Sequence, residues 1–295
     1  MKNIYLKGVY KVDLNNNGRM FLSDEAKHQT QIIDSINISI VCEETTTFIA
    51  TKTIEIEDDQ FNYFTNQDIV DISLDEHTRS LPITIRKILE YLRFFFHITD
   101  IDEKLILSGE TLWSLDNSSW ERIPARNISY SYKWGSWSYR LSDNFLQTIS
   151  ELTQQNIRPF FACNYLCRAI TEENTRHKWI NATIAAELAF KEFLSILDQR
   201  ITTLILNMPS PPIKTLYKVV LKDYTGEESP VWRKLQEGAE KRNKLIHQPN
   251  SVSPTEQEAT IYIQQVEIAI LHLYKLLYKE NEFIQYLYEN ALSNK

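Results

Sequence analysis

The spacing of apolar residues changes about halfway along this chain, and that change limits the folds open to it. In the first half, apolar and polar residues alternate with period two, as in 4–10, 36–40 and 47–51. After about residue 144 the alternation gives way to apolar residues three and four positions apart. Strands bring every second side chain to one face, whereas helices bring every third or fourth. We therefore predict an α+β protein of two domains, β-rich at 1–143 and all-helical at 144–295.

One helix is predicted within the β-rich half. Pro82 suits the first turn of a helix, and the apolar residues up to His97 recur at helical spacing, namely Ile85, Ile88, Leu89, Leu92, Phe95 and Phe96. A turn is predicted at 15–18 and a hairpin at 128–141. The aromatic residues of this hairpin share one face, which suits either core packing against the helix or stacking with unpaired bases.

Helical spacing in the second half predicts a bundle. The expected helices cover 144–155, 159–171, 176–207, 213–222, 230–247 and 255–290. The helix at 176–207 is apolar on more than one side and is expected at the centre. The last helix presents one apolar seam, formed by Ile263, Val266, Ile270, Leu273 and Leu277. His272 falls off this seam, so we expect it at the surface.

Composition narrows the class of protein. The chain is 43% hydrophobic and 24% charged, as in ordinary folded domains. No apolar run approaches the ~20 residues of a membrane span, and the first residues lack the apolar segment of a secretion signal, so we expect a cytoplasmic protein without a membrane partner. Among the three cysteines, Cys163 and Cys167 are expected to pack in the helical core. No His or Cys spacing indicates a metal site, and we expect no cofactor.

The net charge of −7 conceals two stretches of opposite sign. Eight acidic residues and no basic ones lie between Glu55 and Glu76, whereas the stretch from Lys214 to Lys244 has eight basic residues against five acidic ones. The acidic total argues against a general nucleic-acid coat protein, and both stretches can be solvated surfaces. The basic stretch contains the run of residues with the clearest chemistry.

That run is Arg242–His247, which combines a permanent cation with the side chain that titrates near neutral pH. A guanidinium can bind a phosphodiester through two N–H groups, and an imidazole can transfer a proton. Together these functions suffice to cleave RNA without a metal. Chance produces Arg, four residues and His about 0.3 times in a chain of this composition, so the pattern needs support from its surroundings.

Two local features supply that support. Gln248 and Pro249 end the predicted helix, which places His247 at its C-terminus, where the helix dipole favours a protonated imidazole. Asn243 lies four residues before His247 on the same face, so its amide can orient the ring or bind substrate. The alternative is a surface arginine beside a histidine that caps the helix.

In residue type and spacing, Arg242, Asn243 and His247 resemble the signature of the HEPN family, which is Arg, four to six residues and His, often with a polar residue after the Arg. The resemblance covers about residues 146–295. The segment 185–188 is similar to the small-small-Glu pattern of the family's first long helix. Its Glu187 is expected either to pair with Arg242 or Lys241 or to be exposed. Pro249 stands where family toxins controlled by nucleotidyl transfer carry the modified Tyr, so that control is not expected here.

The resemblance implies a metal-independent endoribonuclease that acts as a regulated toxin or an abortive-infection or antiviral defence effector. RNA would be the substrate, and a homodimer would bring two motifs together. The catalytic residues would be Arg242, His247 and Asn243, with Lys241, Lys244 and Glu187 as substrate-binding residues. Because some members have lost catalysis, the alternative is a silent scaffold or a module that binds a nucleotide or a phage component.

The helix geometry also favours a second subunit. Five residues of separation place Arg242 and His247 about 140° apart around a helix, so one helix does not present both on one face. A cytoplasmic ribonuclease must also be restrained. We expect the β-rich domain at 1–143 to act as regulator or sensor, with its acidic stretch 55–76 covering the basic site, or an inhibitory or activating protein partner to control the enzyme.

Overall fold

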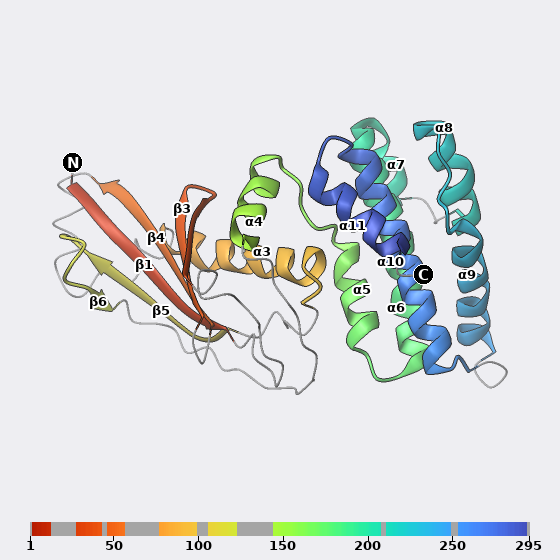
Figure 1. The fold of residues 1–295 in the computed structure, drawn as a ribbon, viewed down its shortest axis with the longest axis horizontal. Coiled ribbons are helices and arrows are strands. Elements are labelled where there is room, and N and C mark those ends of the chain that lie inside the picture. Colours follow the sequence, from red (N-terminus) through yellow and green to blue (C-terminus); the bar gives the residue numbers. More distant parts are fainter. Residues whose placement is uncertain are drawn as a thin grey trace. The chain divides into compact units, whose positions relative to one another are not determined.

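A computed structural model describes residues 2–12, 28–42, 46–56, 77–98, 106–122, 144–207, 211–248 and 253–293 of the chain (Figure 1). The chain divides into two compact units, Met1–Arg158 and Pro159–Lys295. The predicted turn at 15–18, the hairpin at 128–141 and residues 57–76 of the acidic stretch lie outside the described residues. An antiparallel sheet in the first unit and helices in the second confirm the predicted α+β class.

The first unit is built on one antiparallel sheet with the strand order β2-β3-β4-β1-β5-β6. Its strands are β1 (Lys2–Val12), β2 (His28–Ile33), β3 (Ile36–Cys42), β4 (Thr46–Ile56), β5 (Ile106–Ser114) and β6 (Glu121–Arg122). The three strands predicted from period-two alternation are confirmed as β1, β3 and β4. Asp34 and Ser35 join β2 to β3 with φ of 50° and 64°, as a two-residue hairpin turn with two left-handed residues requires.

One face of the sheet forms the core of the first unit. Ile4 and Leu6 of β1 are fully buried, as is Phe48 of β4, while the residues between them are more exposed. Helix α3 (Ser80–Phe95) buries its apolar stripe, including Ile85 and Ile88, and contacts β1 and β4. The predicted helix at 82–97 is therefore confirmed, packed on the sheet as expected.

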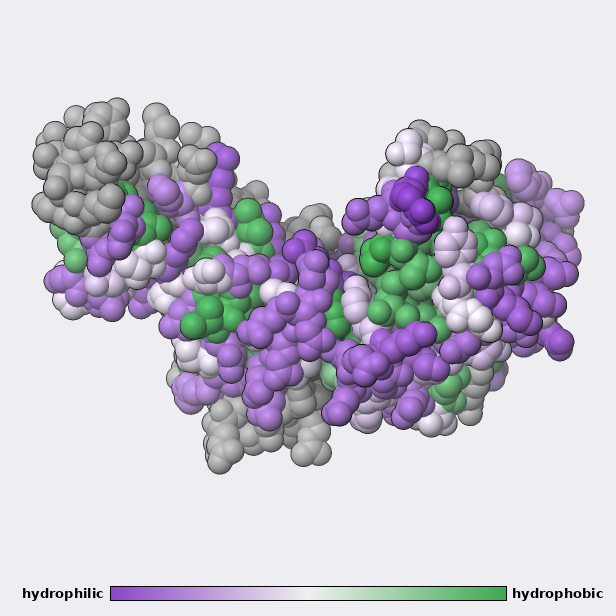
Figure 2. Space-filling view, turned by 90° about the horizontal axis from the view of Figure 1, so that it is seen from above, coloured by the Kyte–Doolittle hydropathy of each residue, from purple (hydrophilic) through white to green (hydrophobic). Residues whose placement is uncertain are grey.

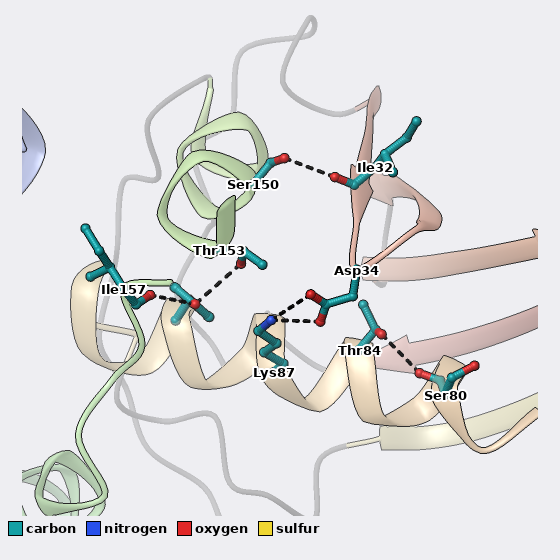
Figure 3. A network of polar contacts seen from close by, with 9 residues as sticks. Ile32, Asp34, Ser80, Thr84, Lys87, Ser150, Thr153 and Ile157 are labelled. Atoms are coloured by element: carbon teal, nitrogen blue, oxygen red, sulfur yellow. Dashed lines mark hydrogen bonds and ion pairs between the residues drawn. The ribbon is translucent and has the colours of Figure 1, made fainter. Parts of the chain in front are cut away.

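Helix α4 (Phe145–Gln154) belongs to the same unit (Figure 3). The Ser150 hydroxyl donates to the backbone oxygen of Ile32 on β2 at 3.0 Å. Tyr91 of α3 donates to the backbone oxygen of Ile157 at 2.7 Å. These bonds tie 145–158 to the sheet and its helix. The division of the chain therefore falls after Arg158 rather than after residue 143, because α4 packs on the sheet.

The second unit is helical. Its elements are α5 (Ala162–Thr171), α6 (Thr175–Leu197), the 3₁₀-helix η1 (Gln199–Ile201), α7 (Thr202–Asn207), the π-helix η2 (Thr215–Val220), α8 (Leu221–Thr225), α9 (Trp232–His247), α10 (Glu256–Leu277) and α11 (Glu282–Ser293). The helices predicted at 159–171 and 230–247 are confirmed as α5 and α9. In Figure 1, α9 lies at the outer edge of this unit.

Two predicted helices are each interrupted in the structure. At each break a polar side chain caps the N-terminus of the helical segment that follows. The expected helix at 176–207 ends at Leu197, where the Asp198 side chain accepts from the backbone N–H of Arg200. The expected helix at 255–290 ends at Leu277, and Asn281 Oδ1 accepts from the backbone N–H of Ile284 at 2.9 Å. The predictions were too long because the apolar spacing continues across both breaks.

The centre of the helical unit is formed by α6, as predicted, in contact with α5, α9 and α10. Its fully buried residues include four alanines, Ala182, Ala185, Ala186 and Ala189, as well as Phe190 and Phe193. Small side chains let the neighbouring helices approach closely. The expected surface position of His272 is wrong: its ring is 2% exposed, because α10 is buried on a second face as well as on its seam.

On the face shown in Figure 2, hydrophilic residues predominate among the coloured ones, with groups of apolar residues between them on both units. No helix within the described residues is long and apolar enough to cross a membrane.

Candidate functional site

Helix α9 carries the Arg242–His247 run and ends where the sequence predicted. His247 is its last residue, and Gln248 follows with φ of −136° and ψ of 61°, outside the helical region. The Gln248 backbone N–H donates to the Lys244 oxygen at 2.7 Å, which closes the last turn. The imidazole therefore stands at the negative end of the helix dipole.

The middle of α9 is seated against two aromatic rings. Trp179 of α6 stacks on Tyr262 of α10 with ring centres 4.3 Å apart and planes inclined by 14°. The indole N–H donates to the Gly238 oxygen at 2.9 Å, and the Tyr262 hydroxyl lies 3.0 Å from the Thr183 hydroxyl. A Cβ atom on Gly238 would overlap the Tyr262 ring. The absence of a side chain at Gly238 thus sets how closely α9 approaches α6 and α10.

Arg242 is held by two acceptors. Its Nη2 atom lies 3.0 Å from Glu187 Oε1 on α6, and its Nη1 donates to Asn243 Oδ1 at 3.0 Å. The Arg242 and Glu187 side chains are 25% and 23% exposed. Of the alternatives expected for Glu187, the structure contains the pair with Arg242. The amide of Asn243 engages the guanidinium, not the imidazole that sequence spacing suggested.

The Glu187 carboxylate influences the tyrosines around this pair. Burial is the main cause that raises the pKa of Tyr262, and the nearby Glu187 raises it further, while Arg242 acts in the opposite direction. Burial and then the charges of Tyr262 and Glu187 raise the pKa of Tyr217, whose hydroxyl donates to the Ala186 oxygen at 2.7 Å. Both phenols therefore stay protonated at neutral pH and serve as hydrogen-bond donors.

The guanidinium retains donors for a ligand. It has five N–H groups, of which Glu187 and Asn243 engage two. Its buried Nε has no hydrogen-bond partner among the described residues. Because Nε is buried, a phosphate oxygen would have to reach the remaining N–H groups on Nη1 and Nη2.

His247 is exposed, and its ring makes no hydrogen bond or ion pair within the part of the chain that the structure describes. In the neutral imidazole, the N–H group of one ring nitrogen and the lone pair of the other are thus available to a ligand. Arg242 and His247 lie about 140° apart around the helix and about 7.5 Å apart along it. One copy of α9 does not bring the guanidinium and the imidazole together.

The two lysines of the run differ in their surroundings. Lys241 Nζ lies 3.0 Å from Glu258 Oε1 and 4.5 Å above the Trp179 ring. A hydrogen bond from the backbone of Thr255, and then Lys241, lower the pKa of Glu258, so this carboxylate stays charged. Lys244 is exposed and has no ion pair among the described residues. Of these two predicted substrate-binding residues, Lys244 alone keeps its charge uncompensated.

Sequence reasoning missed Trp179, Gly238 and Tyr262, which seat the helix. The signal for Gly238 was a glycine inside a helix, which is costly there unless another group must approach closely. No comparable signal indicated that Trp179 and Tyr262 stack on each other, because they lie on different helices far apart in the sequence.

The cysteines are not part of the site. Cys163 and Cys167 are buried free thiols, as predicted, and burial raises the pKa of Cys163. Among the described residues, no group of three or more His, Cys, Asp or Glu side chains is placed to hold a metal ion.

Comparison with protein-family models, with curated proteins and with solved structures found no match to this chain.

Proposed function

We propose that the helical unit is a metal-independent endoribonuclease of the HEPN type. The observation that carries this proposal is the arrangement at the end of α9: a guanidinium fixed by Glu187 and Asn243 lies about 1.4 helical turns before an exposed imidazole. A fixed cation and an accessible proton-transfer group are the two components that phosphodiester transesterification needs.

In this mechanism His247 takes the proton from the ribose 2'-OH, or gives a proton to the leaving 5'-oxygen. The bond from the 2'-oxygen to phosphorus forms as the bond from phosphorus to the 5'-oxygen breaks. Arg242 stabilises the negative charge that develops on the phosphate oxygens through its remaining N–H groups. The products carry a 2',3'-cyclic phosphate and a 5'-OH, and DNA is not cleaved because it lacks the nucleophile.

The separation of Arg242 and His247 around α9 points to a composite site formed by two copies of the chain. In such a dimer, Arg242 of one copy would act with His247 of the other, and both pairs would lie in one cleft. Mixing two inactive variants tests this directly. Arg242→Ala and His247→Ala should be inactive alone and regain activity when mixed, whereas a site contained in one chain would stay inactive.

The activity itself is tested with end-labelled RNA in EDTA. Wild type should cleave it, and His247→Ala should lose about 10²- to 10⁴-fold in rate. His177→Ala is the matched control, since His177 is an exposed histidine of the same unit, 3.8 Å from Glu172. Equal loss in both variants, or cleavage of all-deoxy substrate, would count against the proposed chemistry.

One observation favours a second candidate, a silent HEPN-type scaffold or a module that binds a nucleotide or phage component. Arg242 is tied to Glu187 and does not contact His247 within one copy, which is also what a structural ion pair would look like. The same assay separates the two: a scaffold would leave RNA intact with wild type and with His247→Ala alike.

Regulation is part of the proposal. We assign the first unit the role of regulator or sensor for the ribonuclease, alone or with an inhibitory or activating protein partner, in a toxin or antiviral defence system. Replacing the eight acids of 55–76 with amides should raise basal RNA cleavage if this stretch restrains the site. Unchanged basal cleavage would remove the stretch from the regulatory mechanism.

A further inference from the structure

The opposite end of α9 gathers three cations around one indole ring. Trp232 is the first residue of the helix. Lys218 Nζ lies 4.3 Å from the centre of its ring, the Arg233 guanidinium carbon 5.3 Å and Lys214 Nζ 6.0 Å. Cations are attracted to the face of an indole, which explains how the ring collects them.

Lys218 lies in the π-helix η2, Lys214 immediately precedes it, and this segment is fixed to the rest of the unit. Tyr217, between them, is fully buried and bonds through its hydroxyl to the Ala186 oxygen on α6. The Tyr217 backbone oxygen accepts from the Ser229 N–H at 2.9 Å, and the Ser229 oxygen accepts from the Trp232 N–H at 3.3 Å. The cluster is therefore built on backbone bonds and a buried anchor.

These three cations are not neutralised. Among the described residues, Lys214, Lys218 and Arg233 form no ion pair with a carboxylate. On the same helix, Lys234 pairs with Glu237 at 2.8 Å, and Lys241 pairs with Glu258. Three like charges that converge without counter-charges repel one another, and an anion bound between them would relieve that repulsion.

The distance from the Trp232 cluster to His247 can be compared with the length of a short RNA strand. Trp232 and His247 are fifteen positions apart in the helix, which corresponds to about 22 Å along the axis and about 60° around it. The Trp232 and His247 positions therefore lie on broadly the same side of the helix. A strand stacked as in a duplex advances about 3.4 Å per phosphate, so about six nucleotides, or fewer if extended, would connect the two positions.

We propose that Trp232, Lys214, Lys218 and Arg233 form a subsite for single-stranded RNA, with the three cations on phosphates and the indole stacked on a base. This assignment rests on the proposed ribonuclease function and places the subsite a few nucleotides from the cleaved bond. The pairing of cations with an aromatic ring is what strand-binding proteins use to hold the backbone and bases together. An acidic peptide would match the charges but not the indole.

The test measures RNA binding by the intact His247→Ala chain, which keeps the substrate uncleaved. Anisotropy of a labelled 12-nucleotide RNA across a salt series should show a steep loss of affinity with salt. Each phosphate contact contributes about 0.7 to the slope on single strands. Adding the triple change Lys214→Gln, Lys218→Gln and Arg233→Gln should reduce the slope by about 2, whereas Lys234→Gln, a paired lysine on the same helix, should not change it.

A separate variant measures the contribution of the Trp232 indole to RNA binding. Trp232→Leu keeps an apolar side chain but removes the stacking surface, and it should weaken RNA binding about 5- to 150-fold. Polyglutamate of matched charge should bind weakly and be insensitive to this change. Circular dichroism identifies any variant that fails to fold, and the triple variant changes only side chains that are exposed or half-buried, so it tests the subsite without Trp232.

The possible failures are separable. An unchanged salt slope in the triple variant, or polyglutamate that binds as tightly as RNA, overturns the subsite whatever wild type does to RNA. A reduced slope and RNA-specific binding support the subsite even where wild type cleaves nothing, and in that case the cleavage proposal fails alone. In active protein, the triple variant should raise KM for a 12-nucleotide substrate and leave a dinucleotide unaffected.

Discussion

At the C-terminal end of α9, Lys241 and Arg242 each have a carboxylate partner, whereas at the N-terminal end three cations surround Trp232 and have none among the described residues. The first arrangement fixes a guanidinium in one position at the cost of part of its charge. The second leaves the charges of its side chains uncompensated by a carboxylate within the described residues. Catalysis requires position and binding requires charge, so the two ends suit the two tasks.

The largest expected difference between the ends concerns exchange of arginine for lysine. Arg242→Lys should lower the cleavage rate about 10²- to 10³-fold, because an ammonium cannot contact Glu187, Asn243 and a phosphate together. Arg233→Lys should change it less than about threefold, because that end needs only a cation. Single-turnover rates in EDTA measure both. Comparable losses in the two variants would remove the distinction between a cation held by acceptors and one that has no carboxylate partner.

The contact of Gly238 on α9 with the Tyr262 ring should be sensitive to added side-chain volume. Gly238→Ala should lower the free energy of unfolding by about 1–3 kcal/mol, although alanine normally favours a helix, because its Cβ would overlap the Tyr262 ring. That ring cannot move freely, since it stacks on Trp179 and contacts Thr183. Urea unfolding measures the change, with Gln236→Ala on the same helix as control. A stabilised Gly238→Ala protein would show that the helix tolerates a wider separation.

The coupling energy between Glu187 and Arg242 should be larger than that of an ion pair on the surface. A double-mutant cycle with Glu187→Gln and Arg242→Gln should give a coupling energy of about 1–2 kcal/mol, since both side chains are largely buried. The same cycle on Lys234 and Glu237, which are 59% and 63% exposed, should give about 0.5 kcal/mol or less. Equal coupling in both cycles would mean that Glu187 does not hold Arg242 in place.

Sequence reasoning predicted the parts of this molecule that depend on local chemistry. The end of α9 followed from Pro249, and the pairing of Glu187 was one of the alternatives that the cost of burying a charge on an apolar helix suggested. The strands β1, β3 and β4 followed from alternation. The end of α9 and these strands are each determined by residues within one segment of sequence, whereas Glu187 and Arg242 lie 55 positions apart.

The missed features depend on segments that meet only in the fold. Strands β2 and β5 were not predicted, because their partners in the sheet supply much of their stability. His272 was placed at the surface because its own helix shows one seam, while the second buried face of α10 depends on the elements packed around it. The Trp232 cluster joins η2 to α9, and its lysines look like ordinary solvated residues in the sequence.

The smallest expected effect concerns a contact just before the N-terminal end of α9. Glu227 Oε2 lies 3.4 Å from Nε2 of buried His272 and 3.8 Å from Lys275 Nζ, and the His272 ring also faces Tyr288. Burial lowers the pKa of His272 below its ordinary 6.5, and Glu227 offsets this only in part. His272 therefore binds a proton more readily in the unfolded chain than in the folded one. Its contribution to the free energy of unfolding is fully present above pH 6.5 and is lost as the pH drops toward the pKa of His272 in the folded protein. His272→Gln should flatten this fall in urea unfolding between pH 8 and 5, whereas His177→Gln should follow wild type. A steeper fall in His272→Gln would mean that protonation strengthens the contact with Glu227 more than burial opposes it.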